Sequence, residues 1–73
     1  MKIVKEWSPE LLWAARETAG LTRANAVCVM DKLGFPVSVG SIQNWECGKT
    51  IPQANVIPWL ARAFKVRMEA FYE

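Results

Sequence analysis

Residues 38–50, Ser-Val-Gly-Ser-Ile-Gln-Asn-Trp-Glu-Cys-Gly-Lys-Thr, hold the clearest structural pattern in the 73-residue chain. The hydroxyl of Ser38 suits the N-cap of a helix, and Gly48 suits the position just after its end. Ile42 and Trp45 are three residues apart and share one face, while the two amide side chains between them lie on another. We predict a short helix here, with Trp45 in the core and a polar outer face.

Similar signals frame two helices before this stretch. Ser8 followed by Pro9 is a typical helix start, and Gly20 suits the end of that helix. Thr22 is the next N-cap candidate, and neither Gly nor Pro follows it until Gly34. We therefore predict one helix between Ser8 and Gly20 and a second between Thr22 and Gly34.

The rest of the chain is also helical in pattern. We expect Asn55 to cap a fourth helix, which places Pro58 at the third helical position, where its missing N–H is not needed. The apolar stripe of that helix is Ile57, Leu60, Ala61 and Phe64. Residues 68–72 suggest a short fifth helix, and residues 2–7 a short strand or an ordered arm. The predicted fold class is all-α, with four to five helices in one compact domain over residues 1–73.

The composition excludes most catalytic sites. The chain has 9 Lys+Arg, 7 Asp+Glu, 2 Cys and no His. Without His, a Ser-His-Asp triad, a Cys-His dyad and a Cys₂His₂ zinc site are all impossible, and two Cys alone cannot complete a structural zinc site. We expect no enzyme, no metal and no cofactor. The net charge of +2 is compatible with an anionic partner but does not argue for one.

Size and hydropathy indicate where such a chain works. No segment approaches the length of a membrane span, and the charged N-terminus lacks a signal-peptide core, so we expect a cytoplasmic protein without a membrane partner. In that compartment Cys28 and Cys47 are expected to be reduced. Domains this small are marginal alone, which favours a homodimer. Of the four Trp, Trp59 is expected in the core or an interface, and the surroundings of Trp7 and Trp13 stay open.

Three segments together resemble a known family. Residues 16–22 read Arg-Glu-Thr-Ala-Gly-Leu-Thr, residues 42–50 read Ile-Gln-Asn-Trp-Glu-Cys-Gly-Lys-Thr, and residues 52–66 read Pro-Gln-Ala-Asn-Val-Ile-Pro-Trp-Leu-Ala-Arg-Ala-Phe-Lys-Val. In this order and spacing they resemble the Cro/cI-type (XRE-like) helix-turn-helix family of phage repressors and bacterial regulators, over about residues 10–73. The resemblance implies a lambda-repressor-like domain with its helix-turn-helix at residues 22–46 and an N-terminal arm at residues 1–7.

The resemblance implies that the helix from Ser38 to Glu46 reads bases in the major groove of double-stranded DNA. The expected base-contact residues are Val39, Gly40, Ser41, Gln43 and Asn44. A side-chain amide pairs well with adenine, and an apolar side chain can touch a thymine methyl group. The alternatives are that the two amides are only solvated and that Val39 is partly buried.

Phosphate contacts are expected from residues that flank this helix. They are Thr22, Arg23, Ser38, Lys49 and Thr50. Arg23 holds the first position of the preceding helix, where an anion is favoured; the alternative is a solvated surface charge. Arg16 and Glu46 match two positions that often form a buried ion pair in this family, which is a structural role.

The chain departs from the family pattern between Arg23 and Ile42. These residues are 42 − 23 = 19 positions apart, about five more than usual in this family. The extra residues lengthen the second helix and the turn around Phe35, and Met30 takes the place of the small residue that normally allows close helix approach. The resemblance therefore does not fix the angle of the helix from Ser38 to Glu46.

The function that follows is a sequence-specific transcriptional regulator. We expect a repressor that binds a two-fold DNA operator as a homodimer and autoregulates a phage or mobile-element operon. The apolar residues suited to a dimer interface are Ile3, Val4, Met68, Phe71 and Tyr72; the alternative for Phe71 is the monomer core. The runner-up function is a protein-interaction module, an antitoxin or adaptor, whose helix-turn-helix does not read DNA.

Overall fold

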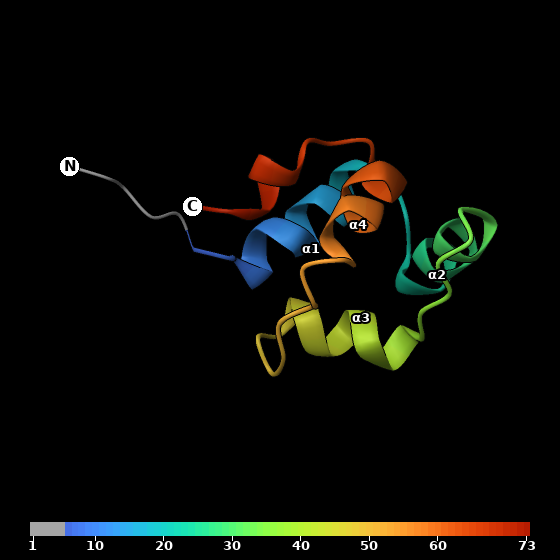
Figure 1. Ribbon diagram of the computed structural model, residues 1–73, viewed down its shortest axis with the longest axis horizontal. Coiled ribbons are helices and arrows are strands. Elements are labelled where there is room, and N and C mark those ends of the chain that lie inside the picture. Colours follow the sequence, from blue (N-terminus) through green and yellow to red (C-terminus); the bar gives the residue numbers. More distant parts are fainter. Residues whose placement is uncertain (1–5) are drawn as a thin grey trace.

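Four α-helices and one 3-10 helix make up the part of the chain that the structure describes, residues 6–73 of a computed structural model (Figure 1). They are α1 (Pro9–Thr18), α2 (Arg23–Lys32), α3 (Val39–Glu46), α4 (Ile57–Phe64) and η1 (Met68–Phe71). The predicted all-α class is confirmed, and within residues 6–73 no strand is present. The fifth helix is a 3-10 helix that ends one residue earlier than expected.

The first three helices begin at their predicted caps. The hydroxyls of Ser8, Thr22 and Ser38 each accept the backbone N–H of the residue three positions further on. After α2 and α3 the backbone turns at Gly34 and Gly48, whose φ values of +89° and +81° lie in the region that favours glycine. The starts and ends of these helices were predictable because each capping residue or glycine lies within four residues of the helix terminus that it determines.

Helix α4 begins differently, so the prediction for Asn55 was wrong. Its N-cap is Val56, which makes no side-chain capping bond, and Pro58 stands at the second helical position rather than the third. Asn55 lies in the turn that precedes the helix. Val56 and Ile57 are both buried. Burial of these two side chains outweighs a cap worth about 1 kcal/mol.

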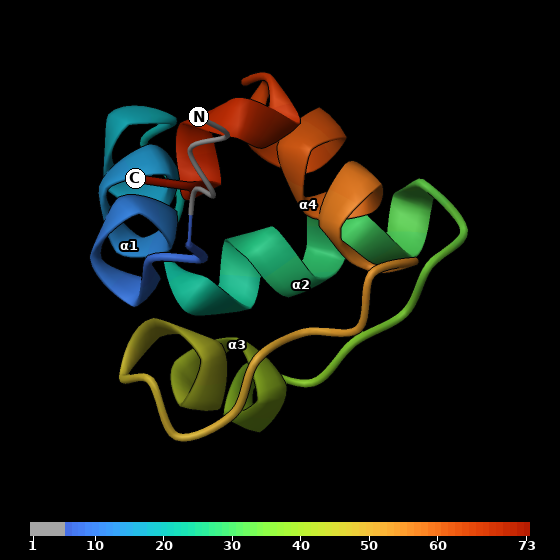
Figure 2. The ribbon, with the colours of Figure 1, turned by 60° about the vertical axis from the view of Figure 1, so that its left-hand side comes forward.

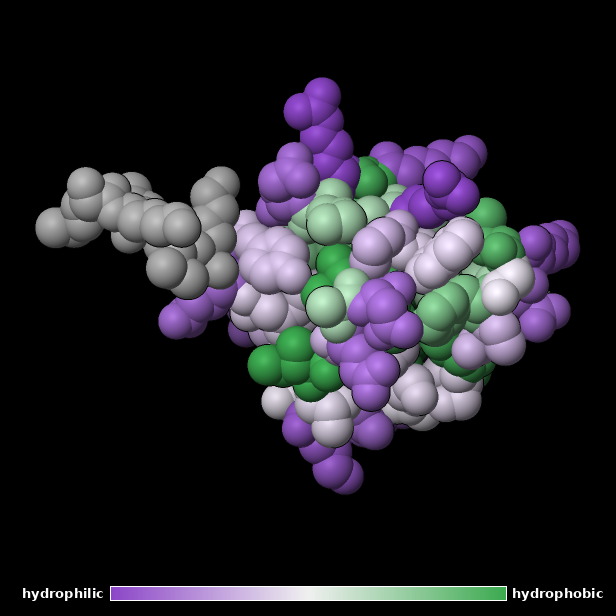
Figure 3. Space-filling view, viewed as in Figure 1, coloured by the Kyte–Doolittle hydropathy of each residue, from purple (hydrophilic) through white to green (hydrophobic). Residues whose placement is uncertain are grey.

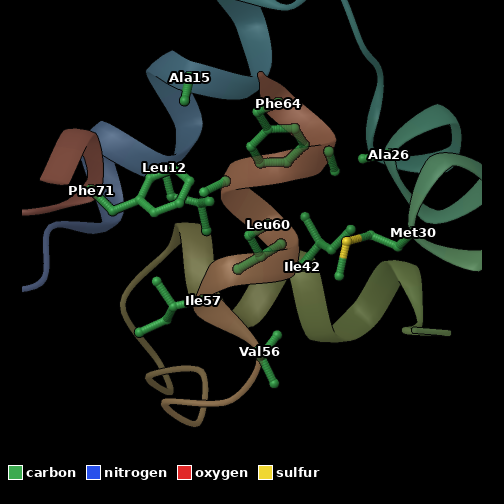
Figure 4. Packing of buried hydrophobic residues seen from close by; sticks show 12 residues of the cluster. Leu12, Ala15, Ala26, Met30, Ile42, Val56, Ile57, Leu60, Phe64 and Phe71 are labelled. Atoms are coloured by element: carbon green, nitrogen blue, oxygen red, sulfur yellow. The ribbon is translucent and has the colours of Figure 1, made fainter. Parts of the chain in front are cut away.

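The core lies where α4 faces the other helices. Its members are Leu12, Ala15, Ala26, Met30, Ile42, Val56, Ile57, Leu60, Ala61, Ala63, Phe64 and Phe71. Figure 4 shows α4 crossing the middle of this cluster, with Met30 and Ile42 pointing toward each other from α2 and α3. Met30 is fully buried. Its flexible side chain fills the space between the helices.

The long turn after α2 is fixed to α4 by aromatic packing. Phe35 stacks on Trp59 with ring centroids 6.0 Å apart, and the backbone N–H of Phe35 donates to the carbonyl of Met30. The Arg62 guanidinium lies 5.4 Å from the centre of the Trp59 ring. Trp59 is partly buried by these contacts. These contacts give the turn a defined position against α4.

The two ends of the described chain lie side by side. Trp7 and Tyr72 form one antiparallel β-bridge, and the backbone N–H of Ser8 donates to the carbonyl of Phe71 at 2.8 Å. Phe71 is fully buried and lies 5.5 Å from Trp7 and 6.4 Å from Phe64 between ring centroids. The expectation that Phe71 forms a dimer interface was therefore wrong, because η1 folds this side chain into the monomer core.

The other candidate interface residues differ in exposure. Met68 is 42% exposed, and Tyr72 is partly buried against the core. Ile3 and Val4 lie outside the described residues. Among the remaining tryptophans, Trp13 is exposed, and Trp45, which was expected in the core, is partly buried and packs against it.

Lys65 ends α4 in an unfavourable backbone conformation, and this generates a stability prediction. Its φ of +59° is the only positive value at a non-glycine residue within the described chain. We expect Lys65→Gly to raise the free energy of unfolding by about 0.5–1 kcal/mol, because glycine has no Cβ to strain there. Urea denaturation is the measurement. Lys65→Ala is the control and keeps the strain; a glycine variant no more stable than the alanine variant would contradict the prediction.

Candidate nucleic-acid interface

Helix α3 lies at the edge of the molecule with one side in the core and the other in solvent. On the inner side of the helix, Ile42 and Glu46 are buried, one helical turn apart. Gly40 and Gln43 are exposed, and Val39 is 42% exposed at its first turn. Figures 1 and 2 both show α3 in the lower part of the molecule, and Figure 2 shows the loop that follows it crossing beside the helix. The docked face and the polar face are thus separated as the sequence predicted.

The other two candidate base contacts have less freedom. Ser41 is partly buried, and its hydroxyl accepts a hydrogen bond from the Ser38 hydroxyl at 2.9 Å. Asn44 is also partly buried. Its backbone carbonyl accepts the N–H groups of Lys49 and Thr50, at 2.9 Å and 3.4 Å. Gln43 is therefore the more accessible of the two amides.

The same bonds place the loop after α3. Because Lys49 and Thr50 donate to Asn44, this loop begins against the last turn of the helix. Both residues are exposed. The structure therefore brings two expected phosphate contacts next to the expected base contacts. The other expected hydroxyls, those of Thr22 and Ser38, already act as helix caps, although both residues are exposed.

A buried ion pair connects α1 to α3. The Nε of Arg16 donates to Glu46 Oε2 at 2.7 Å, and its Nη2 donates to Oε1 at 3.2 Å. The two side chains are only 6% and 2% exposed. Nη1 of Arg16 also donates to the carbonyl of Leu21 at 2.6 Å and lies 3.1 Å from the carboxylate of Glu17. This is the pair that the resemblance implied.

A third helix joins this pair through a contact that the sequence did not reveal. The Nε of Arg23, at the first position of α2, donates to Glu46 Oε1 at 3.1 Å, and the Arg23 side chain is 40% exposed. The sequence predicts Arg23 only as a phosphate contact. Since it lies 23 positions before Glu46, no local signal indicates the bond between them.

The electrostatics of this corner are balanced. The hydrogen bonds that Arg16 donates to Glu46 raise the pKa of Arg16 above its ordinary value, against the opposing effect of burial. A raised pKa on a basic group gives stability that is complete below the ordinary value and is lost only at still higher pH. Arg16 therefore keeps its positive charge beneath α3 as the pH rises through the alkaline range. Arg16 and Arg23 carry two positive charges against the two negative charges of Glu17 and Glu46.

A hollow opens to solvent beside this network. Its volume is about 500 Å³, and its lining residues are Arg16, Glu17, Gly20, Leu21, Thr22 and Arg23. The hollow therefore lies at the junction of α1 and α2, on the side where Arg23 is exposed. Figure 3 shows hydrophilic side chains spread over the face it draws, without one dominant hydrophobic area.

The described residues offer little for other kinds of site. Within residues 6–73, no group of three or more Cys, Asp or Glu side chains is placed to hold a metal ion. In the same range, every helix is too short or too polar to cross a membrane. Cys28 and Cys47 are free thiols, and both are exposed.

The ion pair predicts a large stability effect. We expect Glu46→Gln to lower the free energy of unfolding by about 3–5 kcal/mol, because Arg16 is left as a buried charge without its carboxylate. Differential scanning calorimetry should then show a melting temperature lower by at least about 10 °C. The control is the double variant Arg16→Met with Glu46→Leu, which removes both charges and should lose less. An unchanged melting temperature in Glu46→Gln would contradict the prediction.

Comparison with known proteins adds no further constraint. No protein-family model matches the chain, and neither a curated protein nor a solved structure matches it. Support for a function therefore comes from the placement of α3, the loop that follows it and the charges beside it.

Proposed function

We propose that the chain binds double-stranded DNA sequence-specifically, with α3 in the major groove. The observation that carries this proposal is the placement of α3: it is capped at Ser38, buried on one side by Ile42 and Glu46, and solvent-exposed on the other. An α-helix with its side chains is about 10–12 Å in diameter, which fits the major groove, about 12 Å wide.

The exposed face of α3 supplies the groups that read bases. Gln43 is exposed at its centre, and Asn44 follows it with partial exposure. Both carry an acceptor and a donor that can pair with the edge of adenine. Val39 is exposed at the first turn, where its methyl groups are accessible to a thymine methyl group.

The loop after α3 supports a backbone contact. Lys49 and Thr50 are exposed and tied to the last turn of α3 through the Asn44 carbonyl. A protein positions its reading helix through phosphate contacts on either side of the groove. The modest net charge of +2 implies few such contacts.

We further propose a homodimer that represses transcription by occupying a two-fold operator, in a phage or mobile-element operon. Small size supports dimerisation, and the regulatory role rests on the family resemblance alone. Met68 is the exposed large apolar residue of η1 available for such a contact. The half-sites would lie about one helical turn of DNA, or about 34 Å, apart.

Asn44→Ala tests base reading. Selection of bound sequences from a random duplex pool should yield a defined motif for the unchanged protein. For the variant, discrimination at one base position should fall by about 1–3 kcal/mol, because the paired amide is gone. Gln53→Ala, which removes an exposed amide in the loop before α4, is the control. A wild-type pool without any enriched motif would refute sequence-specific binding.

Lys49→Ala tests the backbone contact. Affinity should fall equally for all sequences, and the slope of log affinity against log salt should decrease by about 0.9, because one phosphate is no longer neutralised. Fluorescence anisotropy across a salt series is the measurement. Lys65→Ala is the control and should change nothing, since Lys65 follows Phe64 at the end of α4 that lies away from α3 in Figure 4. Binding that is insensitive to salt would favour the protein-interaction module instead.

A further inference from the structure

The Arg23 guanidinium is hydrogen-bonded through one edge, and its side chain is partly exposed to solvent. Its Nε donates to Glu46 Oε1, while the side chain remains 40% exposed. A guanidinium has five N–H donors arranged in a plane, so one bond to Glu46 leaves the Nη groups available to a second acceptor. The side chain lies beside the open hollow between α1 and α2.

The carboxylate that holds Arg23 is itself buried and bonded on both oxygens. Glu46 is 2% exposed and is bonded through both oxygens to Arg16, whose Nη1 is fixed to the Leu21 carbonyl. Arg23 is therefore attached to a rigid chain of contacts that also fixes the docked side of α3. A surface arginine without such an anchor loses much rotamer freedom when it binds an anion.

We propose that Glu46 is a positioning residue, which holds the Arg23 guanidinium by Nε so that its Nη groups bind a phosphate of the DNA backbone. This inference rests on the proposed DNA-binding function. It gives Glu46 a second role beyond the buried pair with Arg16, and it makes the shape of the Arg23 side chain matter as well as its charge.

Charge alone predicts the opposite behaviour for Glu46. The carboxylates of Glu17 and Glu46 both belong to the charge cluster around Arg16. If they act only as negative charges near the DNA, neutralising either one should strengthen binding. If Glu46 positions Arg23, its loss should weaken binding, while the loss of Glu17 should not. Glu17 is 51% exposed and makes its ion pair with Arg16 rather than with Arg23, so Glu17→Gln is a matched control.

The experiment compares four variants of the full chain on one labelled duplex of mixed sequence, since phosphate contacts do not depend on sequence. Anisotropy is measured across a salt series, at a temperature where circular dichroism shows each variant folded. We expect Arg23→Ala to weaken binding about tenfold and to reduce the salt slope by about 0.9.

We expect the affinity of Arg23→Lys for DNA to lie within about threefold of that of Arg23→Ala. The compact ammonium of lysine lacks the two separate edges with which a guanidinium can bind Glu46 and a phosphate at the same time. Glu17→Gln should bind at least as tightly as the wild type, and Glu46→Gln more weakly.

Wild-type affinity and slope in Arg23→Lys would overturn the inference, and this variant does not disturb the buried pair of Arg16 and Glu46. The inference would also be overturned if Glu46→Gln bound the duplex with the same affinity as Glu17→Gln. In both cases the proposed function would stand. A wild-type protein without salt-dependent DNA binding would instead refute the proposed function itself, and the inference with it.

Discussion

The buried carboxylate of Glu46 needs a positively charged partner, and that requirement fixes how the surrounding helices pack. A buried charge without a partner costs several kcal/mol, so α3 can dock in this position only when Arg16 of α1 lies beneath it. Arg23 then brings the start of α2 to the same carboxylate. Three helices are therefore held in register by one side chain, which is a stricter condition than apolar packing, because hydrogen bonds have a fixed direction.

The turn after α2 is held in place at a distance from that arrangement. Phe35 and Trp59 attach the turn to α4, while Met30 fills the space toward α3. Both contacts lie toward the end of α2 that is remote from Arg23. The start of α2, which carries the polar contacts, keeps its relation to Glu46.

The sequence was informative where the determining residues are close together along the chain. The caps at Ser8, Thr22 and Ser38 depend on bonds that span three residues, and their patterns are visible without a structure. The ion pair of Arg16 with Glu46 was accessible only through the family resemblance, since 30 positions separate the two residues.

What the sequence missed depends on tertiary packing. The start of α4 is set by burial of Val56 rather than by the nearby Asn55. Burial of Phe71 requires η1 to fold back on α1, and the bond from Arg23 to Glu46 requires both helices to be in place. For the candidate interface, residue types were predictable, whereas their accessibility was not: Ser41 and Asn44 are partly buried, and Gln43 is exposed.

The two exposed thiols give the molecule a built-in pair of attachment points. The chain has 2 Cys, one on α2 and the other directly after α3. Spin labels or fluorophores attached to Cys28 and Cys47 would sit on α2 and at the end of α3. A change in the separation between the labels would report a movement of α3 relative to α2 in solution, free or bound to a partner, without introducing any substitution into the chain.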